Sequence, residues 1–518
     1  MPDMIRKHDI LLSVTAGLCL VFSFSPFNLF PLAWIALVPL LTALSGKSVR
    51  SALMLGLTTG TAFFLGTIYW VFHSMHYYGY LPVTVSISFL LVLCLYLGLY
   101  FGICAALFSY MHAKSKLPAV LTVPVLWVTL EYGRTYLLTG FPWALLGYSQ
   151  HNFLALIQIA DITGIYGVSF LVAACNGLVF DAVMNRKQSE SPSILRKWPL
   201  VPVIILFSVL IAAVLFYGTM KLNVPDQEKH FKVSVIQGNI DQHRKWDRRV
   251  QQEIVDTYTR LTEEAAGDSP DLVVWPETAV PFTFGADKNF TDSLLSYSLL
   301  SFQEKQGHYL LFGSVLAKDP NGGAANSAVL LSPDGRTLSF YDKIHLVPYG
   351  EYVPLRKLLP FVEKLTGGIG DFIPGKERVV MDTPFATIGN LICYEIIFPD
   401  LVRDFVHNGA NVLVTITNDA WFGNTSAPYQ HFATAIFRAV ENRVPVVRAA
   451  NTGISGFIDS RGRVLIKSDI FAEAVLTEGI SPGNKKSFYS QYGDIFAFLC
   501  VGGTVLMFIR NYISKREA

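Results

Sequence analysis

Charged residues are scarce in this chain of 518 residues. Only 15% are Asp, Glu, Lys or Arg, 52% are hydrophobic, and the formal net charge is +2. The chain has no basic patch, no Gly-rich loop of the kind that cradles phosphates, no internal repeat and no low-complexity tract. These absences argue against nucleic acid as a partner and against a phosphate-binding loop.

Cysteine is also rare, with six residues in the whole chain. Five lie in strongly apolar stretches, and Cys393 stands alone in the large polar segment. A lone thiol cannot form a disulfide within its own segment, so Cys393 is either buried and inert or free and reactive. The six histidines of that segment lack the spacing of a zinc site, so we expect neither a metal nor another cofactor.

The apolar residues are spread unevenly along the chain. Residues 1–224 contain about seven apolar stretches, residues 225–490 have the composition of a soluble domain, and residues 491–518 contain one further stretch followed by a short tail. A membrane-spanning helix needs about 20 residues. We therefore predict spans near residues 10–28, 30–45, 51–73, 82–112, 118–137, 159–183, 199–220 and 494–510. A re-entrant hairpin is the alternative for the two short N-terminal stretches.

Basic residues indicate how these spans are oriented. They flank the N-terminus and every second loop, whereas the loops of opposite parity carry almost none except Arg134. Because basic residues favour the cytoplasmic side, both termini are expected in the cytoplasm and residues 225–490 outside it. A cleaved signal peptide is the alternative for residues 1–28, but no small-residue cleavage pattern follows. Glu131 and Arg134, one helical turn apart, are expected to pair near the outer interface.

Short β-rich runs alternate with helical patterns in the soluble segment, which predicts a layered α/β fold. Several runs are almost entirely apolar, as strands buried on both faces are. The predicted strands are Phe231–Gln237, Asp271–Trp275, Tyr309–Val315, Thr387–Cys393, Asn411–Thr417 and Val446–Ala450, and the predicted helices span residues 247–266, 291–306, 399–408 and 428–443.

Three polar residues lie at or just after the ends of apolar strands: Glu277, Lys343 and Cys393. Strand ends are where a rigid sheet directs catalytic groups into one crevice. A carboxylate could take the thiol proton, and an ammonium group could steady the thiolate and a later oxyanion. Each residue also has an ordinary structural alternative, namely a buried thiol, a turn carboxylate and a surface ion pair.

The sequence motifs around these residues resemble those of a known family. Trp275-Pro-Glu277, Tyr341-Asp-Lys343 and Cys393-Tyr-Glu395 resemble the Glu–Lys–Cys triad of the nitrilase superfamily. Together with the predicted spans, further segments resemble the membrane-embedded apolipoprotein N-acyltransferases. These segments are Tyr349-Gly-Glu-Tyr-Val-Pro354, Asn418-Asp-Ala-Trp-Phe-Gly423 and Pro428-Tyr-Gln-His431. The resemblance implies a multi-span α-helical bundle that carries a nitrilase-like αββα sandwich.

The resemblance also implies an activity. Such an enzyme moves an acyl chain from a membrane phospholipid, through a thioester on Cys393, to the N-terminal S-diacylglyceryl cysteine of apolipoproteins. It would lie in the bacterial inner membrane with its catalytic domain on the periplasmic side, and we expect a monomer. Glu277 would be the base, and Lys343 with the backbone N–H of Tyr394 would stabilise the oxyanion. The alternative is a membrane-tethered amidase that hydrolyses a small amide with the same triad.

Other residues of these segments are candidates for supporting roles. Glu351 is expected to orient Lys343, and Glu395 to hold nearby backbone or tune the thiol. His431 is interpreted as structural, and Arg438, Glu441 and Arg443 as a solvated helix face. The candidates for substrate binding are Trp246, Asn418, Trp421 and Phe422.

The segment Leu346–Pro374 is predicted to form a mobile lid at the membrane surface. It alternates leucines with basic residues, and Leu358 and Leu359 are expected to admit acyl chains. A surface loop packed on its own domain is the alternative.

Overall fold

The computed structural model describes residues 4–115, 117–189, 200–225, 228–284, 299–300, 302–318, 323–352 and 372–516. These residues form two compact units. The first comprises Met1–Phe72, Thr84–Val224 and Tyr492–Ala518, and the second comprises His73–Val83 and Pro225–Gln491.

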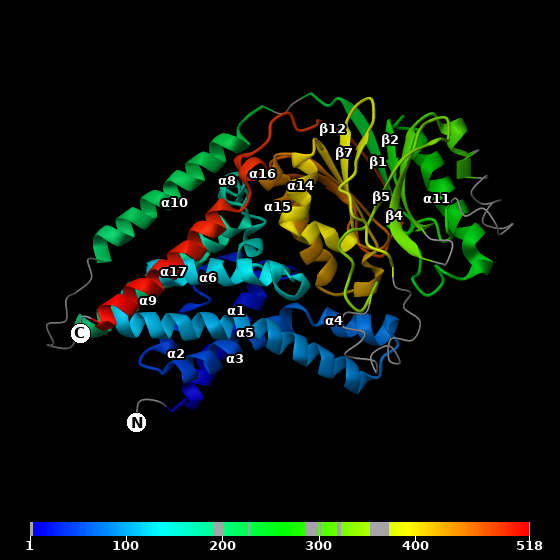
Figure 1. Ribbon diagram of the computed structural model, residues 1–518. Coiled ribbons are helices and arrows are strands. Elements are labelled where there is room, and N and C mark those ends of the chain that lie inside the picture. The colour runs from blue at the N-terminus through cyan, green and yellow to red at the C-terminus, as the bar shows by residue number, and fades with distance from the viewer. Residues whose placement is uncertain are drawn as a thin grey trace. The chain divides into compact units, whose positions relative to one another are not determined.

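The first unit is helical (Figure 1). Among the described residues, five helices are long and apolar enough to cross a membrane. They are α3 (Val49–Thr67), α5 (Val83–Ser115), α9 (Ile165–Ser189), α10 (Leu200–Leu222) and α17 (Ile495–Arg516). The helix α6 (Ala119–Tyr136) packs against both α9 and α17. The shorter elements are α1 (Lys7–Ser23), η1 (Phe30–Trp34), α2 (Val38–Leu44), α7 (Leu154–Ile157) and α8 (Ala160–Thr163).

Three of the predicted spans are not continuous helices, and one of these, residues 159–183, is divided at Gly164 into α8 and α9. The stretch 30–45 is divided into η1 and α2, each with a proline in its first turn, where the missing N–H costs nothing. The stretch 51–73 ends as an α-helix at Thr67 and continues into α4 (Trp70–His73) and the π-helical turn η2 (Ser74–Tyr78).

The buried pair Glu131 and Arg134 of α6 holds a loop. Glu131 Oε1 accepts a hydrogen bond from the backbone N–H of Leu146 at 2.6 Å, and Arg134 Nη1 donates to the carbonyl of Trp143 at 2.9 Å. The two side chains interact electrostatically, and both also bind backbone groups, because a buried loop must have its polar groups satisfied.

The second unit is built around two six-stranded sheets. The first sheet has the order β12-β1-β2-β3-β4-β5, with β1, β2 and β3 parallel and the other pairings antiparallel. Its strands are β1 (Phe231–Gln237), β2 (Leu272–Val274), β3 (Tyr309–Ala317), β4 (Ala324–Leu331), β5 (Thr337–Asp342) and β12 (Ala474–Ile480).

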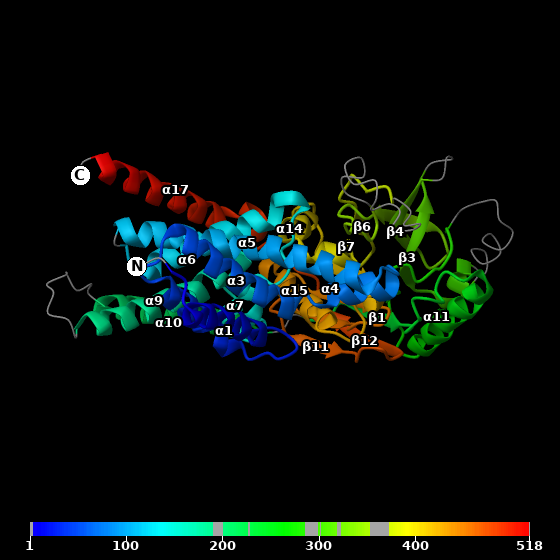
Figure 2. The same cartoon turned by 90° about the horizontal axis from the view of Figure 1, so that it is seen from below.

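The second sheet has the order β11-β10-β9-β8-β7-β6, with β7, β8 and β9 parallel. Its strands are β6 (Val380–Asp382), β7 (Thr387–Ile392), β8 (Val412–Thr417), β9 (Val446–Ala450), β10 (Gly456–Ile458) and β11 (Val464–Lys467). The edge strands β11 and β12 of the two sheets run side by side (Figure 2).

Helices cover the outer faces of both sheets. The helix α11 (Gln251–Ala266) packs Ile254, Tyr258 and Leu261 against Val273 and Trp275 of the first sheet. The helices α14 (Pro399–His407) and α15 (Ala427–Asn442) lie beside the second sheet, on the opposite side from α11 (Figure 1). The order of layers is therefore helix, sheet, sheet, helix, which confirms the predicted α/β sandwich.

Candidate active site

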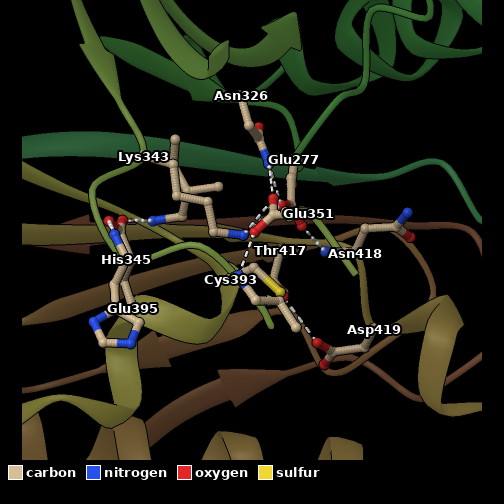
Figure 3. Close-up of polar contacts among 12 residues, drawn as sticks. Glu277, Asn326, Lys343, His345, Glu351, Cys393, Glu395, Thr417, Asn418 and Asp419 are labelled. Atoms are coloured by element: carbon tan, nitrogen blue, oxygen red, sulfur yellow. Dashed lines mark hydrogen bonds and ion pairs between the residues drawn. The ribbon is translucent and has the colours of Figure 1, made fainter. Parts of the chain in front are cut away.

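Glu277, Lys343 and Cys393 are brought together from both sheets. Glu277 follows β2, Lys343 directly follows β5, and Cys393 directly follows β7. Each is 7% exposed or less. Figure 3 shows the sulfur of Cys393 beside Thr417, with the carboxylates of Glu277 and Glu351 above it.

Lys343 is held between two carboxylates. Its Nζ donates to Glu351 Oε1 at 2.9 Å and to Glu277 Oε1 at 3.3 Å. The amide of Asn326, on β4, donates to the same two oxygen atoms at 2.9 and 2.7 Å. Two buried carboxylates can lie this close because they share an ammonium group and an amide donor.

The local electrostatics set the charge of Lys343. Burial lowers its pKa, but Glu351 and Glu277 together outweigh burial, so the pKa of Lys343 is raised and the side chain is an ammonium ion at neutral pH. Glu351 is itself fixed, because its Oε2 accepts from the backbone N–H of Val347 at 2.8 Å.

Glu277 is ionised, and its carboxylate can accept one more hydrogen bond. Burial raises its pKa, but Lys343, Asn326 and Lys245 outweigh burial and the pKa of Glu277 is lowered. Its Oε2 accepts from the backbone N–H of Asn418 at 2.9 Å. A carboxylate has about four acceptor positions, and these contacts occupy three of them. The remaining one on Oε2 is suited to accept a proton.

Cys393, in contrast to Glu277, is held in its protonated form. Burial and the negative charge of Glu277 raise its pKa, and Lys343 and Thr417 offset only part of this effect. Cys393 is therefore a thiol at rest. Its backbone adopts the left-handed region, with φ at 54°. The site thus combines an ionised carboxylate with a protonated thiol.

Glu395 ties the nucleophile turn to the lysine loop. Its Oε1 accepts from the hydroxyl of Tyr341 at 2.7 Å and from the backbone N–H groups of Ile344 and His345 at 2.7 and 3.1 Å. Its Oε2 accepts from the backbone N–H of Ile392 at 2.8 Å. A single side chain therefore fixes the residues on either side of Lys343 and Cys393.

The turn η6 (Cys393–Ile397) begins at the nucleophile. The backbone N–H of Tyr394 consequently lies in the first turn, where helical N–H groups have no acceptor within the helix. The aromatic ring of Tyr394 is buried against Phe398.

A buried cluster lies behind Cys393. His431 Nε2 is 3.2 Å from the carbonyl oxygen of Cys393, and His431 Nδ1 is 3.0 Å from Asp419 Oδ1. Arg448 Nη2 donates to Asp419 Oδ2 at 2.8 Å. Burial lowers the pKa of His431, and its imidazole lies within hydrogen-bond distance of both Asp419 and the backbone carbonyl of Cys393. The histidine supports the turn structurally, as the sequence suggests.

The candidates for substrate binding have different surroundings. Trp246 and Trp421 are 47% and 40% exposed, whereas Phe422 is partly buried near His431. Asn418 is buried. Its backbone N–H donates to Glu277 Oε2, and its side-chain amide donates to Gln242 Oε1 at 2.6 Å, so Asn418 contacts Glu277 directly. Leu358, Leu359 and most of the predicted lid lie outside the described residues.

The segment His73–Val83 contributes aromatic side chains beside this region. The hydroxyl of Ser74 donates to the carbonyl of Trp421 at 2.7 Å, and the ring of Tyr78 stacks on His243 with centroids 5.0 Å apart. Tyr78 also makes an edge contact with Trp421 at 5.5 Å.

Lys245 and Asn326 belong to the site but were not predicted. Lys245 is fully buried and donates from Nζ to the backbone carbonyl of Glu277 at 3.0 Å. In the sequence, the feature that points to Lys245 is its position next to Trp246, a candidate for substrate binding. Asn326 lies in a β-strand that carries no distinctive motif, so its role depends on contacts between distant segments.

Known proteins show strong similarity to the whole chain. Residues 16–178 match the apolipoprotein N-acyltransferase N-terminal domain, and residues 232–487 match the carbon-nitrogen hydrolase family. The apolipoprotein N-acyltransferase of Geobacter metallireducens is 46% identical over 98% of this chain and 96% of its own. That of Chlorobaculum tepidum is 31% identical over 98% of both chains.

Among solved structures, an amidase from Nesterenkonia sp. AN1 matches 52% of this chain and 96% of its own, at 19% identity and a TM-score of 0.39. The two family matches and the full-length relatives lead to one assignment. The chain belongs to the apolipoprotein N-acyltransferases, enzymes that combine a helical membrane region with a nitrilase-type domain.

Proposed function

We propose that this protein moves an acyl chain from a membrane phospholipid to the α-amino group of an N-terminal S-diacylglyceryl cysteine, through a thioester on Cys393. The observation that carries the proposal is the pairing of an ionised Glu277 with a protonated Cys393 beside the ammonium group of Lys343. This is the resting state that general-base activation of a nucleophile requires.

Acylation begins when Glu277 takes the proton from Cys393 as the sulfur attacks the ester carbonyl. The S–C bond forms, and the carbonyl electron pair moves to oxygen. Lys343 has three N–H donors, of which two bind carboxylates, so the third can bind the oxyanion together with the backbone N–H of Tyr394. The C–O ester bond then breaks, and the proton on Glu277 passes to the departing lysophospholipid oxygen.

Deacylation uses the same residues in the reverse order. The α-amino nitrogen attacks the thioester, and Glu277 takes its proton as the N–C bond forms. The C–S bond breaks, and Glu277 returns the proton to the sulfur of Cys393. Each half-reaction therefore restores the resting charges, which fits a ping-pong reaction with two lipid substrates.

We also infer the setting of this reaction. The alternation of basic loops supports a bacterial inner-membrane protein with both termini in the cytoplasm and residues 225–490 in the periplasm. Glu351 and Glu395 would orient Lys343 and the nucleophile turn, and Trp246, Trp421 and Phe422 would contact the acyl substrates. A reporter enzyme active only in the periplasm should work when fused after residue 225 and fail when fused after residue 516.

The test is the mass of the Cys393 peptide. Full-length protein incubated with phospholipid vesicles should gain one acyl chain on this peptide, and a diacylglyceryl-cysteine peptide should then remove it. Glu277→Gln should suppress the adduct, and Cys393→Ala serves as the blank. Continued acyl transfer by Cys393→Ala would disprove the thioester, and release of free fatty acid alone would indicate an amidase-like hydrolase.

A further inference from the structure

Lys245 brings a second buried ammonium group to the triad. Its side chain is fully buried, although the side chain of its neighbour Arg244 is 58% exposed. Removing an ammonium group from water is unfavourable unless nearby charges compensate for the lost hydration. The hydrogen bond that the structure records for Lys245 Nζ, within the described ranges, goes to the backbone carbonyl of Glu277.

The turn that carries Lys245 is fixed from both sides. Asn451 Oδ1 accepts from the backbone N–H of Ile240 at 2.9 Å, and Asn451 Nδ2 donates to the carbonyl of Ile240 at 2.8 Å. Further along the turn, Gln242 is bound by Asn418, whose backbone N–H also binds Glu277. Lys245 is therefore directed at Glu277 by a network that already holds the base.

The charges of the site also require a second cation. Glu277 and Glu351 are two carboxylates, and both use the ammonium group of Lys343. Lys245 interacts electrostatically with Glu277, so the two ammonium groups of Lys343 and Lys245 balance the two carboxylates of Glu277 and Glu351. Burial lowers the pKa of Lys245 to about 8, so its charge persists at neutral pH.

We propose that Lys245 is a positioning residue that fixes the main chain of Glu277 and keeps its carboxylate ionised. It transfers no proton and touches neither lipid. This inference rests on the proposed function, because it assigns Lys245 to the base of that reaction. Lys343, Asn326 and Lys245 lower the pKa of Glu277. The other titratable groups that face Glu277 are Glu351, which shares Lys343 and Asn326 with it, and Cys393 at η6.

The experiment measures how the initial rate of Cys393 acylation depends on pH. Full-length protein is mixed with vesicles of phosphatidylethanolamine and phosphatidylglycerol, and the acyl adduct is quantified by mass. Lys245→Met should move the acidic limb of the profile upward by roughly one pH unit, which makes acylation about tenfold slower on that limb. Lys245→Arg should keep the wild-type limb.

Arg244→Gln is the matched control, because it removes one exposed positive charge from the adjacent position and should leave the limb unchanged. Thermal unfolding is recorded for every variant, and Lys245→Gln replaces the Met variant if that one does not fold. The inference is overturned if neutral variants that fold keep the wild-type limb, or if the Arg variant moves it as far as they do. Absence of the adduct in the wild-type protein would instead reject the proposed function.

Discussion

Single residues in this site are defined by the charges of their neighbours. Lys343 and Cys393 both have raised pKa values, for opposite reasons: two carboxylates stabilise the ammonium ion, whereas burial and a carboxylate disfavour the thiolate. In the proposed reaction, the thiol of Cys393 is therefore activated during the reaction rather than before it.

A spectroscopic measurement distinguishes these two modes of activation. Because the pKa of Cys393 is raised above its usual value of 9.0, the resting protein should carry no thiolate at this position across the neutral pH range. We expect the ultraviolet difference spectrum between wild type and Cys393→Ala to lack the thiolate band there. A band that appears below neutral pH would show a preformed thiolate and contradict the assignment of Glu277 as the base.

At the scale of secondary structure, one glycine of β3 determines how closely the base can approach. A Cβ atom at Gly313 would lie 2.4 Å from the backbone nitrogen of Thr278 and 2.6 Å from the Cα of Glu277. These neighbours are backbone atoms, so they cannot move aside as a flexible side chain would. Gly313 therefore sets the position of the segment that carries Glu277.

Gly313→Ala should displace this segment. Overpacking of this kind costs about 1–3 kcal/mol of stability, and a misplacement of about 1 Å can slow a reaction on the order of 100-fold. Thermal unfolding and the rate of Cys393 acylation measure the two effects. Gly267→Ala is the control, because its nearest neighbour is 3.5 Å away and its substitution should change neither quantity. Wild-type acylation by Gly313→Ala would contradict the close packing.

The elements also show what the sequence can predict. The apolar runs of the sequence predict β1 and β9 with their observed bounds. They predict the ends of β2, β3, β7 and β8 to within a few residues of those in the structure. The strands β4, β5, β6, β10, β11 and β12 were not predicted; β11, for example, is a short edge strand of four residues that is exposed along its whole length, although three of the four residues are apolar. Local sequence patterns therefore identify central strands better than edge strands.

Whether a charged residue on a helix is buried or exposed is harder to predict from the sequence. Arg438 and Glu441 pair at 3.0 Å on α15, as their spacing suggests, but both are fully buried rather than on a solvated face. The error arises because α15 is covered along most of its length, which depends on tertiary packing. The same reason explains why local patterns do not indicate the contacts of Lys245 and Asn326, whereas sequence motifs single out Glu277, Lys343 and Cys393.

At the scale of the whole molecule, the chain contributes a distant segment to its catalytic unit. His73–Val83 follows the third predicted span, yet it belongs to the unit formed by Pro225–Gln491. Its Tyr78 contacts both His243, two residues before Lys245, and Trp421, three residues after Asn418. It therefore joins the two loops that reach Glu277.

Tyr78→Ala should slow acyl transfer several-fold while leaving the triad intact, because the loops lose a shared aromatic contact worth about 1 kcal/mol. Tyr77→Ala is the control, since the ring contacts of Tyr77 are with His73 and His76 of its own segment. Rates of acylation and of transfer to the peptide acceptor should be measured separately. Equal rates for the two variants would show that the contact has no functional effect.

The left-handed backbone of Cys393 has a consequence for how this protein can be improved. A non-glycine residue in this conformation costs roughly 1–2 kcal/mol, whereas glycine adopts it freely. Selection for heat resistance alone would therefore favour glycine at position 393, which would remove the thiol that the proposed acyl transfer needs. Any programme of thermal stabilisation must consequently screen for acyl transfer in every round, since the most reactive position is also one where the fold is under strain.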